Sequence, residues 1–268
     1  MRTAWLLSRS LVFLLVQAAL TVLFGSLAFL TWPLPPVWRI RLIAVPWTRS
    51  VLCALRLICG IRVQVIGREN LPDAPVIVLS KHQSAWETLA YMGYSPRPPC
   101  FVFKKELLYI PFFGWGIGLM RMIAIDRSQG RNAFEQVVRD GLQRLQEGRW
   151  IIMFPEGTRI PVGQTGSYKT GGARLAIRTQ MPVLPIAHNA GECWPKNRFI
   201  KQPGCITVSI GPLLSSRDKT PEMLNAEVES WIEAEMRRLN PERYPPNTTL
   251  LKQATTISLA TVDKTTRA

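Results

Sequence analysis

The stretch PVIVLSKHQSAWETLAYMG, residues 75–93, contains the pattern that decides the fold. Residues 76–79 form a short apolar, β-branched run that follows a proline, which is typical of a buried strand. A polar turn comes next, and residues 86–93 are then predicted to form a helix. A strand, a turn and a helix in this order are the repeating unit of layered α/β domains.

The same alternation continues on both sides of this stretch. Further short strands are predicted at 63–66, 101–103, 122–125, 150–154, 183–187 and 206–210, and helices at 132–147, 171–179 and 221–239. This order predicts one α/β domain, residues 61–245, with a mainly parallel sheet flanked by helices. Residues 246–268 are rich in threonine and lysine and are predicted to be a flexible tail.

Residues 1–60 differ in character and are predicted to anchor the chain in a membrane through a helical segment. The apolar run at 11–32 is long enough to cross a bilayer as a helix. Arg2 and Arg9 precede the run, and Trp5 and Trp32 lie near its ends, as interfacial residues do. A cleaved signal peptide is the alternative, but the run is long for one and lacks a clear cleavage site.

The segment 37–59 alternates apolar residues with four arginines and predicts one or two basic amphipathic helices on a membrane surface. A re-entrant hairpin formed with the first helix also fits this pattern, as does a core helix of the following domain. The first acidic residue of the chain is Glu69, and its late position favours a membrane-associated N-terminal region.

Charge and cysteine content limit the possible partners. The net charge of +15 fits nucleic acid, an anionic membrane or a phosphorylated substrate. The N-terminal basic residues lie beside apolar runs, which favours membrane lipids and argues against nucleic acid. The five cysteines are scattered and the two histidines lack ligand-spaced partners, so we expect no disulfide framework, no metal and no cofactor.

One polar group follows the strand at 76–79. His82 lies in the turn and Glu87 lies five residues later, so the two meet only if His82 precedes the helix and folds back. Glu87 would then hold the imidazole in the tautomer of a general base. Alternatively, Ser84 and Glu87 form a capping box that closes the start of the helix. His188 is interpreted as structural or substrate-facing.

A second polar group, Phe-Pro-Glu-Gly-Thr-Arg at 154–159, ends another predicted strand. Its glycine permits a close backbone approach and Arg159 offers a fork for phosphate, whereas a surface ion pair of Glu156 with Arg159 is the alternative. Basic residues also lie near other strand ends, namely Lys104, Lys105 and Arg127, and Lys169 lies beside the flexible glycines at 171–172. Because such ends meet at one edge of a parallel sheet, an anion site is expected there.

The order and spacing of these blocks resembles the glycerolipid acyltransferase family, and most closely the bacterial 1-acylglycerol-3-phosphate (lysophosphatidic acid) acyltransferases. The resemblance covers about residues 67–212. It implies that His82 is the general base and that Glu87 orients it. It also implies that other residues bind the substrate phosphate or shape its site: Lys105, Arg127, Glu156, Gly157, Thr158 and Arg159. The segment 183–187 would line the substrate pocket.

One residue departs from the family pattern. The family usually has aspartate where this chain has Glu87, so the start of the helix must adjust if Glu87 is to reach the imidazole.

The resemblance implies a reaction as well as a fold. A fatty acyl group would pass from acyl-CoA or acyl carrier protein to the sn-2 hydroxyl of lysophosphatidic acid, giving phosphatidic acid in phospholipid biosynthesis. Backbone N–H groups near the helix start would stabilise the oxyanion. The expected location is a bacterial inner membrane, with the catalytic domain facing the cytoplasm. Another lysolipid acceptor, or a non-catalytic basic membrane protein, is the alternative.

Overall fold

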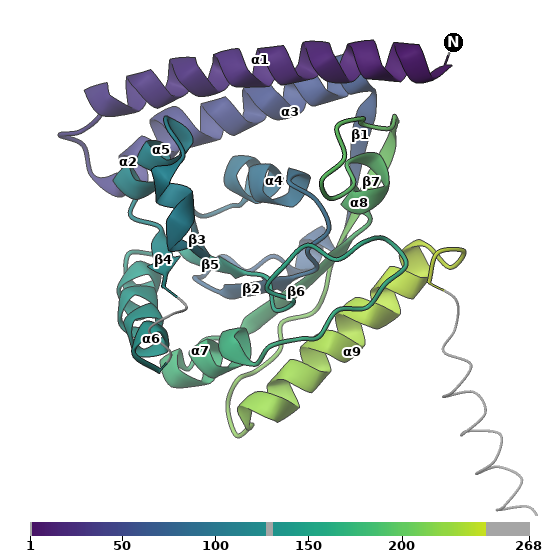
Figure 1. Ribbon diagram of the computed structural model, residues 1–268. Coiled ribbons are helices and arrows are strands. Elements are labelled where there is room, and N and C mark those ends of the chain that lie inside the picture. Colours follow the sequence, from purple (N-terminus) through teal and green to yellow (C-terminus); the bar gives the residue numbers. More distant parts are fainter. Residues whose placement is uncertain (1, 127–130, 245–268) are drawn as a thin grey trace, which may run out of the picture.

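The computed structural model describes residues 2–126 and 131–244, and a seven-stranded sheet forms its centre (Figure 1). The strands are β1 (Ile61–Ile66), β2 (Ile77–Ser80), β3 (Pro99–Lys104), β4 (Ile123–Ile125), β5 (Trp150–Met153), β6 (Val183–His188) and β7 (Gly204–Ile210). The larger helices of the domain are α4 (Trp86–Tyr94), α6 (Arg131–Gln146), α7 (Gly171–Thr179) and α9 (Pro221–Leu239). The predicted tail, 246–268, lies outside the described residues.

The strand order is β1-β7-β6-β2-β5-β3-β4. Every pair of neighbours is parallel except β6 and β7, which are antiparallel. The prediction of an α/β domain with a mainly parallel sheet is confirmed. Each predicted strand matches an observed one to within two residues at either end. The central strands β2 and β6 are buried on both faces, and such strands appear in the sequence as apolar runs.

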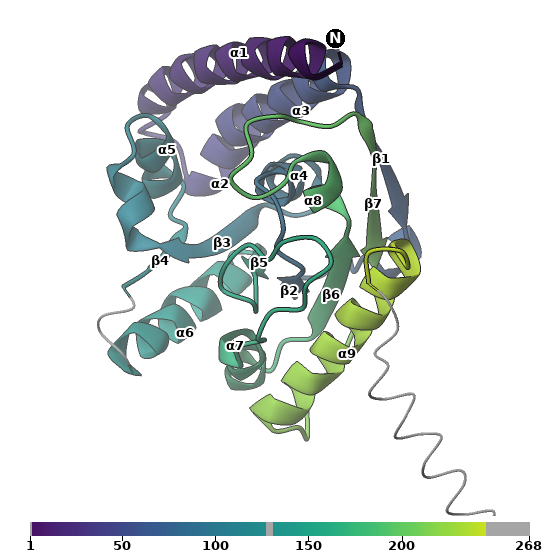
Figure 2. The ribbon, with the colours of Figure 1, turned by 45° about the vertical axis from the view of Figure 1, so that its right-hand side comes forward.

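The sheet has helices on both faces (Figures 1 and 2). Successive residues of a strand point to opposite faces, so Val78 packs in a core cluster with α3 and α4, whereas Ile77 and Leu79 pack with α6, α7 and α9. All four residues of β2 are buried. The turn after β2 is therefore held by a strand fixed on both faces.

The N-terminal residues form a helical hairpin. Helix α1 (Arg2–Leu30) is followed by α2 (Pro36–Arg39), a π-helical turn (Ile40–Ala44) and α3 (Val45–Cys59), which ends at Gly60 in the left-handed conformation. Figures 1 and 2 show α1 lying along α3, and α3 in turn packs against α4. Helix α3 thus packs on the following domain, as the core-helix alternative for 37–59 expects, whereas the predicted contact of this segment with a membrane stays a prediction.

The outer surface of the hairpin is apolar. Leu11, Leu15 and Leu23 are at least half exposed along α1, away from α3. Among the described residues, the segments Arg2–Leu30 and Pro36–Cys59 are long and apolar enough to cross a membrane, by length and composition only.

Two short helices were not predicted. The glycine run at 114–118, interpreted from sequence as a place of close packing or acyl-chain contact, forms α5 (Phe113–Leu119), and α8 (Ala190–Cys193) follows β6. A β-carbon on Gly114 would lie 2.3 Å from the carbonyl oxygen of Leu108, so this glycine is required by close packing.

Gly67 ends β1 and gives a stability prediction. Its φ is +77°, and an added β-carbon would lie 2.1 Å from the carbonyl oxygen of Ile210 at the end of β7. We expect Gly67→Ala to lower the free energy of unfolding by about 2 kcal/mol or more, through backbone strain and the clash. Thermal unfolding in detergent measures this change.

Gly116→Ala is the matched control, because Gly116 is helical and an added β-carbon would meet nothing within 4 Å. That variant should be neutral or up to about 1 kcal/mol more stable. Equal stability of Gly67→Ala and the wild type would contradict the prediction.

Candidate active site

A cavity of about 910 Å³ opens beside the turn that follows β2. Its walls are mostly apolar and come from α1, α3, α4, β3 and α5, so the N-terminal hairpin forms part of the cavity wall. Its apolar lining includes Phe24, Ala28, Ile43, Leu89, Met92, Phe101, Ile117 and Met120. A long apolar ligand fits such a space because burial of its hydrocarbon surface is favourable.

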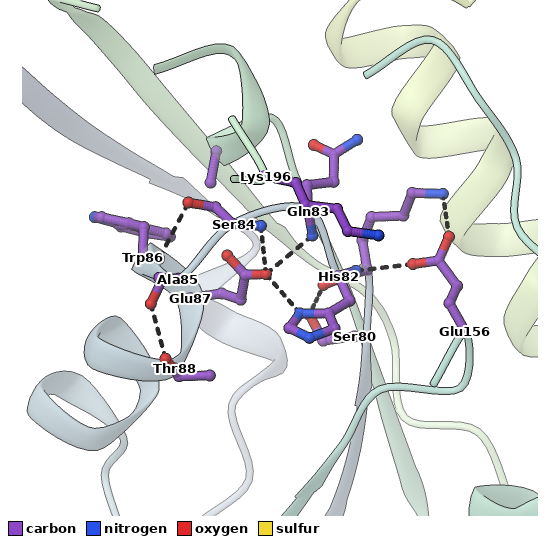
Figure 3. A network of polar contacts seen from close by, with 12 residues as sticks. Ser80, His82, Gln83, Ser84, Ala85, Trp86, Glu87, Thr88, Glu156 and Lys196 are labelled. Carbon is purple, nitrogen blue, oxygen red and sulfur yellow. Dashed lines mark hydrogen bonds and ion pairs between the residues drawn. The ribbon is translucent and has the colours of Figure 1, made fainter. Parts of the chain in front are cut away.

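His82 lines this cavity and is held by Glu87, as expected from the sequence (Figure 3). The Nδ1 atom of His82 lies 2.7 Å from Glu87 Oε1. A carboxylate only accepts hydrogen bonds, so in the neutral ring Nδ1 carries the proton and Nε2 keeps its lone pair. The imidazole is stacked on the Phe154 ring at a centroid distance of 4.0 Å. The ring is therefore fixed in the tautomer and orientation that a general base needs.

Glu87 both orients His82 and closes the helix start. Its Oε1 accepts the backbone N–H groups of Gln83 at 2.9 Å and of Ser84 at 2.8 Å, in addition to the His82 bond (Figure 3). Glu87 therefore contacts His82 and also accepts backbone N–H groups ahead of the helix, so the two interpretations of Glu87 from the sequence do not exclude each other. The turn at 82–85 places His82 ahead of α4 and gives the longer glutamate side chain its reach.

Glu87 is fully buried, yet its bonds keep it ionised. Burial alone would raise the pKa of Glu87, but the neighbouring His188 and the hydrogen bonds from His82 and Ser84 outweigh it and hold the pKa below its ordinary value. The carboxylate can then stabilise an imidazolium that forms on His82 during a reaction.

The two sequence blocks are bonded to each other through the backbone of His82. Its N–H donates to Glu156 Oε2 at 2.9 Å, and its carbonyl oxygen accepts the N–H of Ile160 at 2.7 Å. The other oxygen of Glu156 accepts from Lys81 Nζ at 2.7 Å. Glu156 is buried and lies outside the cavity lining, so its placement differs from the phosphate contact expected for it.

Cationic side chains gather at the polar part of the cavity. Arg159, Lys104, Lys169 and Lys196 line it, and its lining contains no carboxylate among the described residues. The Nε atom of Arg159 is buried without a hydrogen-bond partner in the part of the chain that the structure describes. Such an arrangement suits an anionic group, which would supply the missing acceptor.

The turn at 157–158 brings two of these lysines together with the Arg159 segment. Gly157 has a φ of +66°, and the Lys169 side chain packs beside it, with Nζ 3.4 Å from where a β-carbon would lie. Thr158 Oγ1 accepts from Lys196 Nζ at 3.4 Å. Both residues thus contact the lysines of this turn, and the role in substrate binding implied for them stays a prediction.

Two other expected phosphate contacts stay predictions. Lys105 is half exposed, its Nζ lies 3.6 Å from Asp126 Oδ2, and it is outside the cavity lining. Arg127 lies outside the described residues. Sequence reasoning missed Lys196, because it lies in a loop after α8 with no motif around it. It did notice Lys169 beside its glycines.

The structure narrows one further expectation and corrects another. The N–H groups of His82, Gln83 and Ser84 are donated to Glu156 and Glu87, so these three are not available to an oxyanion, and oxyanion donors at the start of α4 itself stay a prediction. All six residues of β6 are buried and none of 183–187 lines the cavity. This segment instead pairs with β2, the strand that leads into the turn of His82.

His188 has a structural place. Its Nε2 donates to the carbonyl oxygen of Lys81 at 2.9 Å, and burial lowers the pKa of His188 below its ordinary value. Within residues 2–126 and 131–244, no group of three or more His, Cys, Asp or Glu side chains could hold a metal ion.

Comparison with known proteins agrees with this geometry. Residues 62–189 match the family model described as Acyltransferase. The chain is also 44% identical over 237 residues to the 1-acyl-sn-glycerol-3-phosphate acyltransferase of Pseudomonas aeruginosa, covering 87% of this chain and 92% of that protein. The chain belongs to the acyltransferase family. The non-catalytic alternative considered from sequence is thereby overturned.

Other relatives of the acyltransferase extend this similarity. The 1-acyl-sn-glycerol-3-phosphate acyltransferase of Borreliella burgdorferi is 30% identical over 159 residues, covering 59% of this chain and 63% of that protein. The crystal structure of the 1-acyl-sn-glycerophosphate acyltransferase PlsC from Thermotoga maritima is similar with a TM-score of 0.70 and 25% identity, and the match covers 89% of this chain and 98% of that one. The α/β fold of the acyltransferase is therefore that of a known member.

Proposed function

We propose that this acyltransferase transfers a fatty acyl group from an acyl thioester to the free sn-2 hydroxyl of 1-acylglycerol 3-phosphate, giving phosphatidic acid. The observation that carries the proposal is the His82–Glu87 pair, which presents a free Nε2 to an apolar cavity. The cavity has a cationic rim, formed by Lys104, Arg159, Lys169 and Lys196. The relatives named 1-acyl-sn-glycerol-3-phosphate acyltransferase support this choice of acceptor.

The chemistry follows from the tautomer of His82. Nε2 accepts the proton of the acceptor hydroxyl, and the oxygen attacks the thioester carbonyl; general-base help of this kind contributes about 10²- to 10⁴-fold. The imidazolium that forms is stabilised by Glu87. The tetrahedral intermediate then collapses with loss of the thiolate, which takes the proton back from Nε2. The donor is already activated, so no covalent enzyme intermediate is needed.

The cationic rim would hold the acceptor phosphate. Arg159 is the first candidate because its Nε atom is buried and lacks an acceptor among the described residues. Lys169 packs against Gly157 and Lys196 donates to Thr158, so both lysines contact the turn that precedes Arg159. Lys105 and Arg127, implied by the family resemblance, are kept as further candidates, and Glu156 would act on this site only through the turn it supports.

The hairpin would keep the enzyme where its acceptor is. We assign residues 1–60 to membrane anchoring and 61–245 to catalysis, with the apolar outer face of α1 in contact with membrane lipids. A bacterial inner membrane with the catalytic domain on the cytoplasmic side would give access to both acyl-CoA and acyl carrier protein as donors.

The phosphate assignment gives a kinetic prediction. In vesicles with either donor, the wild type should acylate 1-acylglycerol 3-phosphate in strong preference to 1-acylglycerol, which lacks the phosphate. Arg159→Ala should raise KM for the phosphorylated acceptor about 10- to 100-fold, since charged hydrogen bonds of this kind are worth about 1.5–3 kcal/mol. Its effect on the phosphate-free acceptor should be small.

Arg178→Ala is the matched control, because Arg178 is an exposed arginine of α7 that pairs with Glu135 away from the cavity. It should leave KM unchanged. Equal use of the two acceptors by the wild type would reject the proposed phosphate site, and efficient transfer only to a different lysolipid would replace the acceptor while keeping the chemistry.

A further inference from the structure

A buried cluster of charged side chains lies behind the turn that carries His82. Lys81 Nζ donates to Glu156 Oε1 and to Glu233 Oε1, each at 2.7 Å. The side chains of Lys81 and Glu156 are completely buried, and that of Glu233 is 6% exposed. None of the three lines the cavity. A fully buried lysine is uncommon in proteins, so this cluster needs an explanation.

Glu233 links the C-terminal helix α9 to the loop at 154–170. Its Oε1 accepts from Tyr168 Oη at 2.9 Å and its Oε2 accepts from Thr165 Oγ1 at 2.8 Å. The same loop carries Arg159 and Lys169 to the cavity rim. Helix α9 therefore reaches the cationic rim through two hydroxyl groups.

The cluster also reaches the histidine. Glu156 Oε2 accepts the backbone N–H of His82 at 2.9 Å, and His188 donates to the carbonyl of Lys81 at 2.9 Å. Burial alone would lower the pKa of Lys81, but the charges of Glu156 and Glu233 outweigh it and raise the pKa, so the ammonium group stays charged. One side chain thus joins α9, the rim loop and the His82 turn.

Stability is a weak reason for such a cluster. Removing charged groups from water costs several kcal/mol for each ion, and well-packed apolar residues are often as stable or more stable in their place. The two carboxylates also outnumber the single ammonium group. What the cluster supplies is a fixed geometry between segments that are far apart in the chain.

We propose that Lys81 and Glu233 are positioning residues of the acyl transfer, which rests on the function proposed above. Glu233 holds Lys81, Lys81 holds Glu156, and Glu156 holds the backbone of His82. Through Tyr168 and Thr165, Glu233 also fixes the loop that presents Arg159. The cluster thereby sets the distance between the general base and the group that binds the acceptor.

Two near-isosteric variants separate the effect of the cluster on His82 from its effect on the loop that presents Arg159. Glu233→Gln removes the charge that holds Lys81 and should lower kcat about tenfold or more, since a displacement of about 1 Å can cost a reaction 10²-fold. Tyr168→Phe removes one of the two bonds between Glu233 and the loop and leaves the Lys81 bonds intact, so it should raise KM for 1-acylglycerol 3-phosphate several-fold with kcat near the wild-type value.

The control is Val228→Ala, a buried apolar residue of the same helix that is outside the cluster. Its loss of stability should equal or exceed that of Glu233→Gln, yet its kcat should stay within about twofold of the wild type when each variant is assayed at the same interval below its own Tm. Glu235→Gln, a partly buried residue of α9 that pairs with Arg238, checks for the effect of removing a carboxylate from this helix outside the cluster.

The assay separates this inference from the proposed function. A wild type that transfers no acyl group to any lysolipid overturns both. An active wild type with equal kcat in Glu233→Gln and Val228→Ala shows a cluster that is only structural, and overturns the positioning role alone.

Discussion

Replacing His82 by alanine is expected to lower acyl transfer by about 10²- to 10⁴-fold, the contribution of a positioned general base. The reason is that Nε2 of His82 is the basic nitrogen freed by the bond of Nδ1 to Glu87. The measurement is labelled acyl transfer by isolated membranes whose own enzyme of this type has been removed. Both acyl-CoA and acyl carrier protein are supplied as donors.

The same variant should fold and bind membranes normally. The bonds of residue 82 to Glu156 and Ile160 use its backbone, so they survive the loss of the side chain. Thermal unfolding and flotation with vesicles check this. Activity within about tenfold of the wild type in a folded, membrane-bound His82→Ala protein would remove His82 from the reaction.

Glu87 is expected to show two separable effects. Glu87→Gln keeps an oxygen that can accept from Gln83 and Ser84, but it is neutral and cannot stabilise the imidazolium. We expect its kcat to fall about 10- to 100-fold, since hydrogen bonds to charged groups are worth about 1.5–3 kcal/mol. At neutral pH its free energy of unfolding should fall by less than the free energy that corresponds to its loss of kcat.

Glu87→Ala removes the acceptor altogether. The N–H groups of Gln83 and Ser84 then lose their partner in a buried turn, at a cost of about 1–3 kcal/mol for each unsatisfied group. Thermal unfolding should therefore rank the wild type above Gln and Gln above Ala, whereas activity should be low in both variants. A stable and active Glu87→Gln enzyme would reduce Glu87 to a helix cap.

The lowered pKa of Glu87 also predicts how stability depends on pH. A carboxyl group whose pKa is lowered by folding stabilises the folded state above its unfolded pKa. This stabilisation is lost as the pH falls through the folded pKa. The wild type should therefore lose stability on the acid side faster than Glu87→Gln does, measured as Tm against pH below the ordinary pKa of glutamate.

The strands and most helices could be predicted because their signals are local. The runs at 76–79 and 183–187 are buried on both faces, so each is apolar without interruption. The short helices α5 and α8 could not be predicted, because glycines in α5 lower its helical propensity and α8 has only four residues. Tertiary packing decides both.

The residues of the site also divide into those with a local sequence signal and those placed only by tertiary packing. His82 and Glu87 lie within six residues of each other, so their meeting depends on one turn. Lys196 and Glu233 reach the site from distant parts of the chain, and no local pattern marks either of them. The acceptors of the His82, Gln83 and Ser84 N–H groups, Glu156 and Glu87, are visible only after folding, so the sequence could not exclude these three groups as oxyanion donors.

The strand order also limits the order in which the parts of the chain can fold during translation. Strand β1 is an edge strand whose neighbour is β7, with Ile61 paired to Gly204. During translation the hairpin of α1 and α3 emerges first, while the partner of β1 is the last strand to be made. We expect the hairpin to be able to meet the bilayer before the sheet can close. A chain that stalls before β7 would leave β1 as an open edge, which is a template for aggregation.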